Sequence, residues 1–542
     1  MNKSYNKLSL SIGRWVLFSI VVSITLGFAF YTNHAWEDWY MTFRASKNLA
    51  MGNGLVFTPG EHLHTFTSPL GTLIPALLSY WVGPTNDELV LWLFRIISAS
   101  LLGFSAMLLL RCARKSVQYA LPVFMVVAVL ALDAKIIDYS INGMETAFMV
   151  FFLSLLIYAL TVPLHNPVYW LALAIAGLMW SRPDSFVYIG SVMIGIFLFN
   201  PQSRLARSRA EWLSYFVRAG LWGLVLYLPW VVCAWCYYGT PVPNTITAKG
   251  LGYFDALALA KEFILFPVTS LFSINSLQLT FGPAYMSFGG WNLLIPLFSK
   301  LLTFVGISYW MLPFARRAVR PWSFAAYLAH FYLSYVLPTA EPWYIPSVTV
   351  LCTWALALEF NHFIDWVCQK RPTFIPAIKS ITVTVIGFQL IVLVCVAYQM
   401  RVQQQLIETT NRKSIGLWLN ENAKSGSTVY LECLGYIGFY SNMKMYDFPG
   451  LSSKEVVEAR KTLKSNDLNK LVPYLKPDYL VLRPVDQINT SLKEQYVQVK
   501  RFDVSSLVDS YPFLPGRGYL QFDQTFTVYK RKISIDQVLT LK

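Results

Sequence analysis

Long apolar runs separated by short polar segments fill most of the chain up to about residue 398. A helix needs about 20 apolar residues to cross the roughly 30 Å hydrocarbon core of a bilayer. The first run is followed by many others and by no small-residue cleavage site, so we interpret it as a retained helix and not as a signal peptide. The pattern predicts eleven membrane-spanning helices, at 15–31, 89–110, 119–135, 143–161, 168–182, 184–199, 219–237, 291–313, 321–337, 344–364 and 377–398.

Two further apolar stretches do not fit as crossings. Segment 69–83 has only 15 residues and contains Pro75, and segment 256–285 is broken by Pro267 and Pro283. Apolar segments of this length and kind are typical of interfacial or re-entrant helices. We therefore expect 69–83 to lie at the outer membrane surface and 256–285 to be an interfacial or re-entrant segment.

Basic residues predict the orientation of the bundle, because Lys and Arg favour cytoplasmic loops. They gather in alternate loops and are sparse in the others. The basic segments are 1–14, 111–118, 200–218, 314–320 and 365–376, and they include Arg204 and Arg207. This pattern puts the N-terminus in the cytoplasm. The long loops 32–88 and 238–290 then lie outside with their interfacial helices, as does everything after residue 398.

The chain changes character after residue 398, where polar residues become frequent. The pattern predicts helices at 401–422 and 453–464 and strands at 428–432, 479–483 and 519–530. The predicted fold class is thus an all-α polytopic membrane bundle of about 11 transmembrane helices (1–398). It carries a small extracytoplasmic α/β domain (399–542).

Composition agrees with a membrane protein, since 55% of the 542 residues are hydrophobic and only 13% are charged. The net charge of +15 does not indicate a nucleic-acid partner, because the basic residues are dispersed among apolar runs. Cys233 and Cys236 have a metal-like spacing, but they lie inside an apolar run without a second pair, which indicates helix packing. The partners expected from composition are therefore the lipid bilayer and its components.

An acidic pair follows the first predicted helix, where Glu37 and Asp38 stand between aromatic residues. A carboxylate at the membrane boundary is partly desolvated, which suits a general base that takes a proton from an acceptor hydroxyl. The simpler interpretation is a helix start, because acidic residues favour the positive end of the helix dipole.

Other ionisable residues gather on the same predicted side of the membrane, where their cost indicates function. His62 and His64, next to Glu61, are candidates for a metal, a phosphate or a sugar. Arg95 either snorkels to the interface or binds a phosphate. The remaining candidates for a donor-phosphate or substrate site are Glu145, Arg182, Asp184, Lys249 and Glu341.

Several cations around a carboxylate pair suit one reaction class. A sugar on a polyprenyl phosphate holds its anionic phosphate at the membrane surface, and a glycan or glycolipid acceptor arrives from the water. The alternative is a lipid-linked saccharide flippase or another polytopic transporter, which would place charges near the bilayer midplane. No cofactor is predicted firmly, and a divalent metal remains an alternative.

Five sequence blocks resemble the C-fold (GT-C) membrane glycosyltransferases, and most closely the mycobacterial terminal arabinofuranosyltransferase and its bacterial relatives. The blocks appear in the order expected of that family. They are EDWYMTFRASKNLAMGNGLVFTPGEHLHTFTSPL (37–70), NGMETAFM (142–149), SRPD (181–184), YYGTPVPNTITAK (237–249) and LGYIGFYSNMKMYDFPGLS (434–452).

The resemblance implies an inverting transferase of a bacterial inner membrane that uses a polyprenyl-phosphate sugar. The base would be Asp38 or Glu37; this chain has Glu where the family usually has its first Asp, and we favour Asp38. Arabinose specificity is not implied, because nothing in these blocks selects the sugar. The implied donor-site or site-shaping residues are Tyr238, Asn244, Lys249, Arg182 and Asp184, with Glu145 as the acid of the second outer loop.

Overall fold

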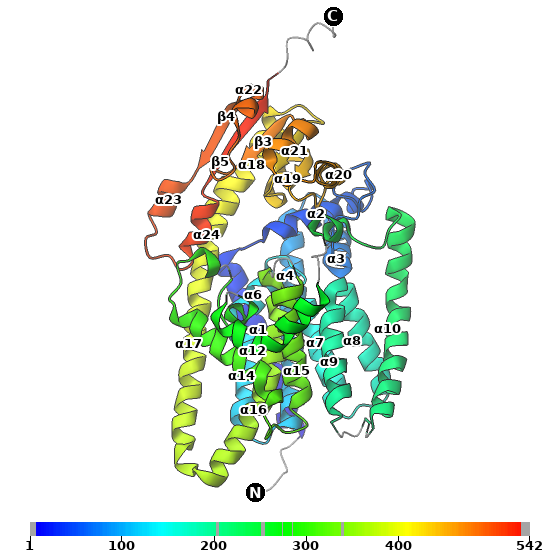
Figure 1. Cartoon of the computed structure of the whole chain (residues 1–542), viewed down its shortest axis with the longest axis vertical. Coiled ribbons are helices and arrows are strands. Elements are labelled where there is room, and N and C mark those ends of the chain that lie inside the picture. Colours follow the sequence, from blue (N-terminus) through cyan, green and yellow to red (C-terminus); the bar gives the residue numbers. More distant parts are fainter. Residues whose placement is uncertain are drawn as a thin grey trace, which may run out of the picture.

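The fold is a long helical bundle with a small sheet-containing domain at one end (Figure 1). The computed structural model describes residues 7–201, 205–206, 208–250, 255–273, 275–284, 286–337 and 341–532. The chain enters at the end of the bundle opposite the small domain, and α1 runs towards that domain. The basic residues Arg204 and Arg207 lie outside the described residues.

Helices occupy every predicted span. The helices of the bundle are α1 (Lys7–Thr32), α4 (Asp87–Ser116), α5 (Ala120–Leu132), α6 (Ala134–Ile141), α7 (Thr146–Thr161), α8 (Pro167–Ser181), α9 (Phe186–Phe199), α10 (Arg209–Tyr238), α14 (Leu294–Ser308), α15 (Arg320–Phe331), α16 (Ile345–Lys370) and α17 (Ile375–Gln403). By length and composition, six helices of the described chain can cross a membrane, or seven if the bent pair α5 and α6 forms one span. Helices such as α7 and α8 are apolar but shorter.

The predicted span 119–135 ends earlier than expected. The chain bends by 41° between α5 and α6. Asp133 causes the break, because its side chain accepts a hydrogen bond from the Ile136 backbone N–H (2.9 Å) and so caps a new helix. Residues 134–141 continue at this angle inside the bundle, where Ile136 and Ile137 are fully buried.

The two long loops carry further helices, and those of the first loop lie at the end of the bundle that faces the small domain. The first loop contains α2 (Glu37–Ala50) and α3 (Pro69–Val82). The second contains α11 (Asn244–Lys249), α12 (Ala256–Phe272) and α13 (Ser276–Thr280). Ser68 begins α3 by accepting a hydrogen bond from the Gly71 backbone N–H (2.9 Å), with Pro69 at the first helical position.

The small domain is an α/β unit with a five-stranded sheet in the order β2-β1-β3-β5-β4. Strands β1, β2 and β3 are parallel, and β5 runs antiparallel to β3 and β4. The strands are β1 (Thr428–Leu431), β2 (Lys444–Asp447), β3 (Tyr479–Leu482), β4 (Tyr496–Asp503) and β5 (Thr525–Arg531). The helices are α18 (Ser414–Asn422), α19 (Gly435–Ser441), α20 (Lys454–Leu463), α21 (Leu468–Leu475), α22 (Thr490–Gln495), α23 (Ser505–Asp509) and α24 (Arg517–Phe522).

The predicted strand at 519–530 is wrong in its first half. Residues 517–522 form α24, and β5 begins only at Thr525. Tyr519 and Leu520 are buried against Trp36 in an apolar cluster that joins α24 to the bundle. This tertiary packing overrides the alternating pattern, as is common for strand propensity.

The small domain sits directly on α2. Arg44 of α2 is buried and donates hydrogen bonds to the carbonyl oxygens of Gly438 (2.6 Å) and Met443 (3.0 Å). The Tyr436 hydroxyl donates to the Ala35 carbonyl oxygen (3.0 Å). The loop after β1 therefore meets α2, and the carboxyl ends of parallel strands are where open α/β sheets usually form binding crevices.

Candidate active site

The start of α2 is held in place by the turn at Asn142 and Gly143. The Trp36 backbone N–H donates to the Asn142 carbonyl oxygen (2.8 Å). Gly143 has φ +101°, and a side chain there would collide with the Trp39 ring. Only glycine adopts this conformation readily, so this turn fixes the position of the acidic pair in the first turn of α2.

Asp38 lines a small cavity between α2, the start of α3, α11 and the small domain. The cavity has a volume of about 60 Å³, which is room for only a few water molecules. A sugar is larger, so its binding would require lining side chains to move. The polar residues of the lining are Asp38, Thr42, Thr67, Ser68, Glu145, Arg182, Thr245, Lys249 and Tyr344.

Arg182 is fixed by two carboxylates on one wall of the cavity. Its Nη1 lies 2.6 Å from Glu145 Oε1, and its Nε lies 2.9 Å from Asp184 Oδ1. Its Nη2 donates to Asp184 Oδ2 (3.0 Å), so Asp184 binds the guanidinium in a bidentate manner. The guanidinium carbon also lies 4.5 Å from the centre of the Tyr344 ring. The result is a rigid cation with defined orientation at the cavity wall.

Lys249 ends α11 and lines the same cavity. Its ammonium nitrogen lies 6.0 Å from the centre of the Trp343 ring. Asn244 begins α11 and donates from Nδ2 to the carbonyl oxygens of Gly450 (2.8 Å) and Leu451 (3.1 Å). Asn244 therefore attaches α11 to the loop after β2, and this attachment places Lys249 at the cavity.

Tyr238, His64 and His62 lie around this site as packing residues. The Tyr238 hydroxyl donates to the Leu55 carbonyl oxygen (2.6 Å), and its ring stacks on His64 at 4.6 Å. Burial lowers the pKa of His64 to about 4, so its ring is neutral at pH 7. His62 packs against Tyr237. Among the described residues, no three His, Cys, Asp or Glu side chains come together as metal ligands.

The electrostatics around Asp38 suit a group that titrates near neutral pH. Partial burial raises the pKa of Asp38 to about 6, and the negative charges of Glu341 and Glu145 act in the same direction. Lys249 and Arg182 oppose the increase. Glu341 acts through this field and is not part of the cavity lining, whereas its neighbours Trp343 and Tyr344 are.

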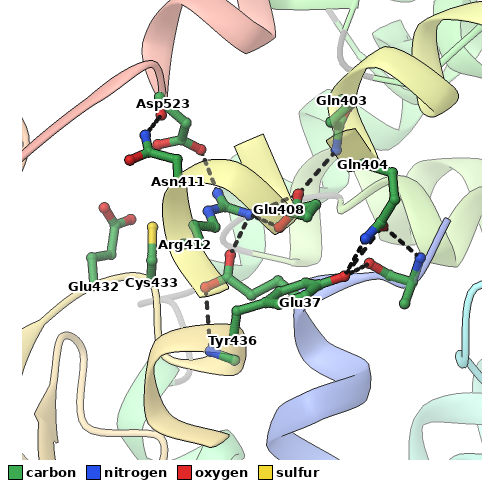
Figure 2. Close-up of polar contacts among 12 residues, drawn as sticks. Glu37, Gln403, Gln404, Glu408, Asn411, Arg412, Glu432, Cys433, Tyr436 and Asp523 are labelled. Atoms are coloured by element: carbon green, nitrogen blue, oxygen red, sulfur yellow. Dashed lines mark hydrogen bonds and ion pairs between the residues drawn. The ribbon is translucent and has the colours of Figure 1, made fainter. Parts of the chain in front are cut away.

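Glu37 points away from the cavity, into a buried network that joins α2 to the small domain (Figure 2). Its Oε1 accepts a hydrogen bond from the Gly435 backbone N–H (3.2 Å), and its Oε2 lies 3.1 Å from Arg412 Nη1. Arg412 also binds Glu408 (2.9 Å) and Asp523. A side chain at Gly435 would collide with the Glu37 backbone, so the contact needs glycine.

Burial raises the pKa of Glu37 to about 8, and Arg412 opposes the increase. Each Glu37 oxygen already faces an N–H donor of this network, so Glu37 is not open to an acceptor hydroxyl. The two adjacent acids thus face different surroundings, one a cavity with cations and the other a closed network. The sequence did not reveal this division, because the partners of Glu37 lie far along the chain.

Arg95 also lies outside the cavity, among the loops that surround the start of α2. Its side chain is fully buried. It donates to the Ile141 carbonyl oxygen (2.9 Å), Asn33 Oδ1 (2.8 Å) and the His34 carbonyl oxygen (2.7 Å). These bonds hold Arg95 among backbone and side-chain oxygens of the bundle, and Arg95 is not among the residues that line the Asp38 cavity.

We therefore expect Arg95→Met to lower stability by about 2–4 kcal/mol, because it leaves buried oxygens without donors. Thermal unfolding in detergent measures the loss. Arg111→Met in the same helix is the control, since Arg111 is exposed and, among the described residues, donates to the Tyr158 hydroxyl (3.3 Å). Equal melting temperatures for the two variants would contradict this structural role.

Another cavity is an apolar groove of about 510 Å³ between α5, α14, α16 and α17. Its lining is mainly aromatic and aliphatic, and Glu359 is its one charged member among the described residues. Such a lining suits hydrocarbon and not a sugar. The polar cavity at Asp38 is therefore the better candidate for chemistry.

The comparisons with known proteins cover both parts of the chain. Residues 397–529 match a family profile described as a domain of unknown function, DUF8728. No curated protein sequence matches. Among solved structures, ArnT from Cupriavidus metallidurans is 12% identical with a TM-score of 0.53, and the match covers 96% of this chain and 98% of ArnT. The archaeal oligosaccharyltransferase AglB from Archaeoglobus fulgidus is 12% identical with a TM-score of 0.51, covering 86% and 69%.

At this level of identity the similarity shows the fold, and it confirms the predicted fold class. The chain is a multi-pass membrane protein with a GT-C-like helical bundle and a small C-terminal α/β domain. The resemblance found in the sequence blocks is thus confirmed at the level of fold.

Proposed function

We propose that this GT-C-fold protein is a glycosyltransferase that moves a sugar from a polyprenyl-phosphate donor to a cell-envelope glycan or glycolipid. One observation carries the proposal: a carboxylate, Asp38, and two cations, Arg182 and Lys249, line one polar cavity at the end of a membrane bundle. AglB, which shares the fold, was solved with a dolichol-phosphate and an inhibitory peptide. A lipid phosphate as donor is consistent with that neighbour.

In the proposed reaction, Asp38 takes the proton from an acceptor hydroxyl. The hydroxyl oxygen bonds to the anomeric carbon of the donor sugar as the bond from that carbon to the phosphate oxygen breaks. The electron pair of that bond passes to the phosphate, whose added charge Lys249 and Arg182 stabilise. Attack from the face opposite the phosphate inverts the anomeric centre. No metal is assigned a role.

We place the cavity on the extracytoplasmic side of a bacterial inner membrane, with the N-terminus in the cytoplasm. The support is the distribution of basic residues, which favours the cytoplasm for the loops at the opposite end. A lipid-linked donor suits this side, because nucleotide sugars are made in the cytoplasm whereas a polyprenyl chain keeps its sugar at the membrane.

The test uses the full chain in liposomes with a radiolabelled polyprenyl-phosphate sugar and an envelope-glycan extract on one side. We expect label to move from the lipid to the glycan, with release of the polyprenyl phosphate. If labelled lipid instead crosses the bilayer intact and no glycan becomes labelled, the protein is a flippase and the proposal is wrong. Protein-free liposomes provide the background for both measurements.

A further inference from the structure

A second polar pocket lies beside the Asp38 cavity, between α11 and helix α20 of the small domain. Its volume is about 270 Å³, equivalent to roughly nine water molecules at ~30 Å³ each. Four basic side chains line it: Lys249, Arg460, Lys461 and Lys464. The described lining contains no carboxylate, and its other polar members include Ser465 and Asn466. We call this the basic pocket.

The three lysines of the basic pocket are exposed, and Arg460 holds together the two parts of the chain that carry them. Arg460 Nη1 donates to the carbonyl oxygens of Ala248 and Pro449, both at 2.7 Å, and Arg460 Nε donates to Asn466 Oδ1 (2.8 Å). These bonds fix α20 against the end of α11. The position of the pocket relative to Lys249 is therefore defined by the fold.

The positive charge of the basic pocket is only partly balanced, by the interaction of Lys249 with Asp38 of the adjoining cavity. The carboxylates of α20 pair elsewhere, Glu455 with Lys444 and Glu458 with Lys454. Across the described chain, no carboxylate forms a salt bridge with Lys249, Lys461 or Lys464. Cations near the C-terminal end of a helix are stabilised by its free carbonyl groups. This effect accounts for a lysine at position 461 or 464, at the end of α20. It does not account for a pocket that these two lysines share with Lys249 of another helix.

Lys249 lines both the basic pocket and the Asp38 cavity. An anion held by Lys461 and Lys464 would thus lie next to the cavity. The donor phosphate is not the expected anion, because the pocket has only Ala248 and Val457 as apolar side chains and offers no surface for a polyprenyl chain. Arg182, on the wall formed by the bundle, is better placed for the donor.

We propose that the basic pocket binds an anionic group of the acceptor, a phosphate or a sugar carboxylate, and so presents the acceptor hydroxyl to Asp38. This inference rests on the proposed function and gives the small domain a role in acceptor recognition. Lys and Arg bind both kinds of anion. The binding experiment distinguishes a phosphate from a sugar carboxylate.

The test measures binding to the full chain in phosphatidylcholine nanodiscs, so that anionic lipid does not compete. The probes are inorganic pyrophosphate, trigalacturonate and the neutral maltotriose. We expect one of the two anions to bind, with affinity that falls as salt rises, and maltotriose not to bind. The anion that binds identifies the chemistry of the acceptor.

The double variant Lys461→Gln, Lys464→Gln should weaken that binding at least about tenfold. The matched control is Lys470→Gln, Lys476→Gln, which removes the same charge from α21 and the residue after it, in the same domain. Lys476 follows α21 with φ +51°, as Lys464 follows α20 with φ +47°, so backbone strain is equal. Similar melting temperatures would show that both variants fold.

Equal anion affinity in the wild type and the Lys461, Lys464 variant would overturn the proposal, as would failure of both anions to bind. This readout does not depend on turnover. A protein that binds the anion as expected but transfers no sugar would refute the proposed function and leave an anion site. A protein that transfers sugar but binds no anion would refute only the basic pocket.

Discussion

Replacing Asp38 by Asn is expected to lower the rate of sugar transfer by about 10²- to 10⁴-fold, the usual contribution of a general base. The amide keeps the shape of the side chain but cannot accept the hydroxyl proton. Asp38 is half-buried at the cavity with Lys249 and Arg182, so the change does not remove a partner from a closed network. Initial rates with a radiolabelled polyprenyl-phosphate sugar provide the measurement.

Glu37→Gln is the matched control, since it makes the same chemical change one residue earlier in the same helix. Glu37 belongs to the closed network and does not line the cavity. Gln keeps the size of a side chain that lies outside the cavity, so we expect transfer within about threefold of the wild type, a change below ~1 kcal/mol. The reverse result, with Glu37→Gln inactive and Asp38→Asn active, would assign the base to Glu37.

The pH dependence of kcat/KM distinguishes the same two acids. A base works when deprotonated, so the rate should rise with pH and level off above the pKa of the base. With the pKa of Asp38 raised to about 6, the rise should end near pH 7. A rate that continues to rise through pH 8 would instead follow Glu37, whose pKa is about 8.

Much of the fold can be predicted from the sequence because apolar runs report directly on membrane helices. The limits of that signal are local. Asp133 ends α5 through a single cap, and Tyr519 joins a helix because it packs on Trp36; neither contact is visible in an apolar pattern. Strand β5 is shorter than its alternating sequence indicates for the same reason.

The residues of the candidate site, too, can be predicted only in part from the sequence. The sequence singles out Asp38, Glu145, Arg182 and Lys249, and these residues line one cavity. It also singles out Arg95, whose side chain donates to backbone carbonyl oxygens of loops. A cation within an apolar run looks the same in the sequence whether it binds a phosphate or backbone carbonyls. Trp343 and Tyr344 line the cavity without any charge to draw attention to them.

The network around Glu37 is the part of the structure that the sequence predicts least. Glu408 and Arg412 are four residues apart in one helical segment, so their pairing is visible in sequence. Asp523 lies 111 residues beyond Arg412, and Glu37 belongs to another domain. Only the docking of the small domain on α2 brings these groups together, and no local pattern encodes it.

Arg412→Met is expected to cost about 3–5 kcal/mol of stability, the usual effect of removing one partner from a buried ion network. Arg412 is 1% exposed and is the shared partner of Glu37, Glu408 and Asp523. Its loss leaves Glu408 buried without its cation at the junction between α2 and the small domain, whereas Asp523 keeps Arg483 (2.5 Å). We therefore expect the junction to loosen first, which limited proteolysis around residues 404–413 and thermal unfolding in detergent would detect.

Lys413→Met is the control for Arg412→Met, because it removes a neighbouring cation that is only half-buried and contacts the Tyr440 ring at 4.8 Å. Its cost should stay below about 1 kcal/mol. The Arg412 variant should also lose transfer activity, since Glu37 and Asp38 share the first turn of α2 and a loosened junction displaces both. If Arg412→Met has the same melting temperature and the same resistance to proteolysis as Lys413→Met, the network does not hold the small domain. The position of Asp38 then depends on the bundle alone.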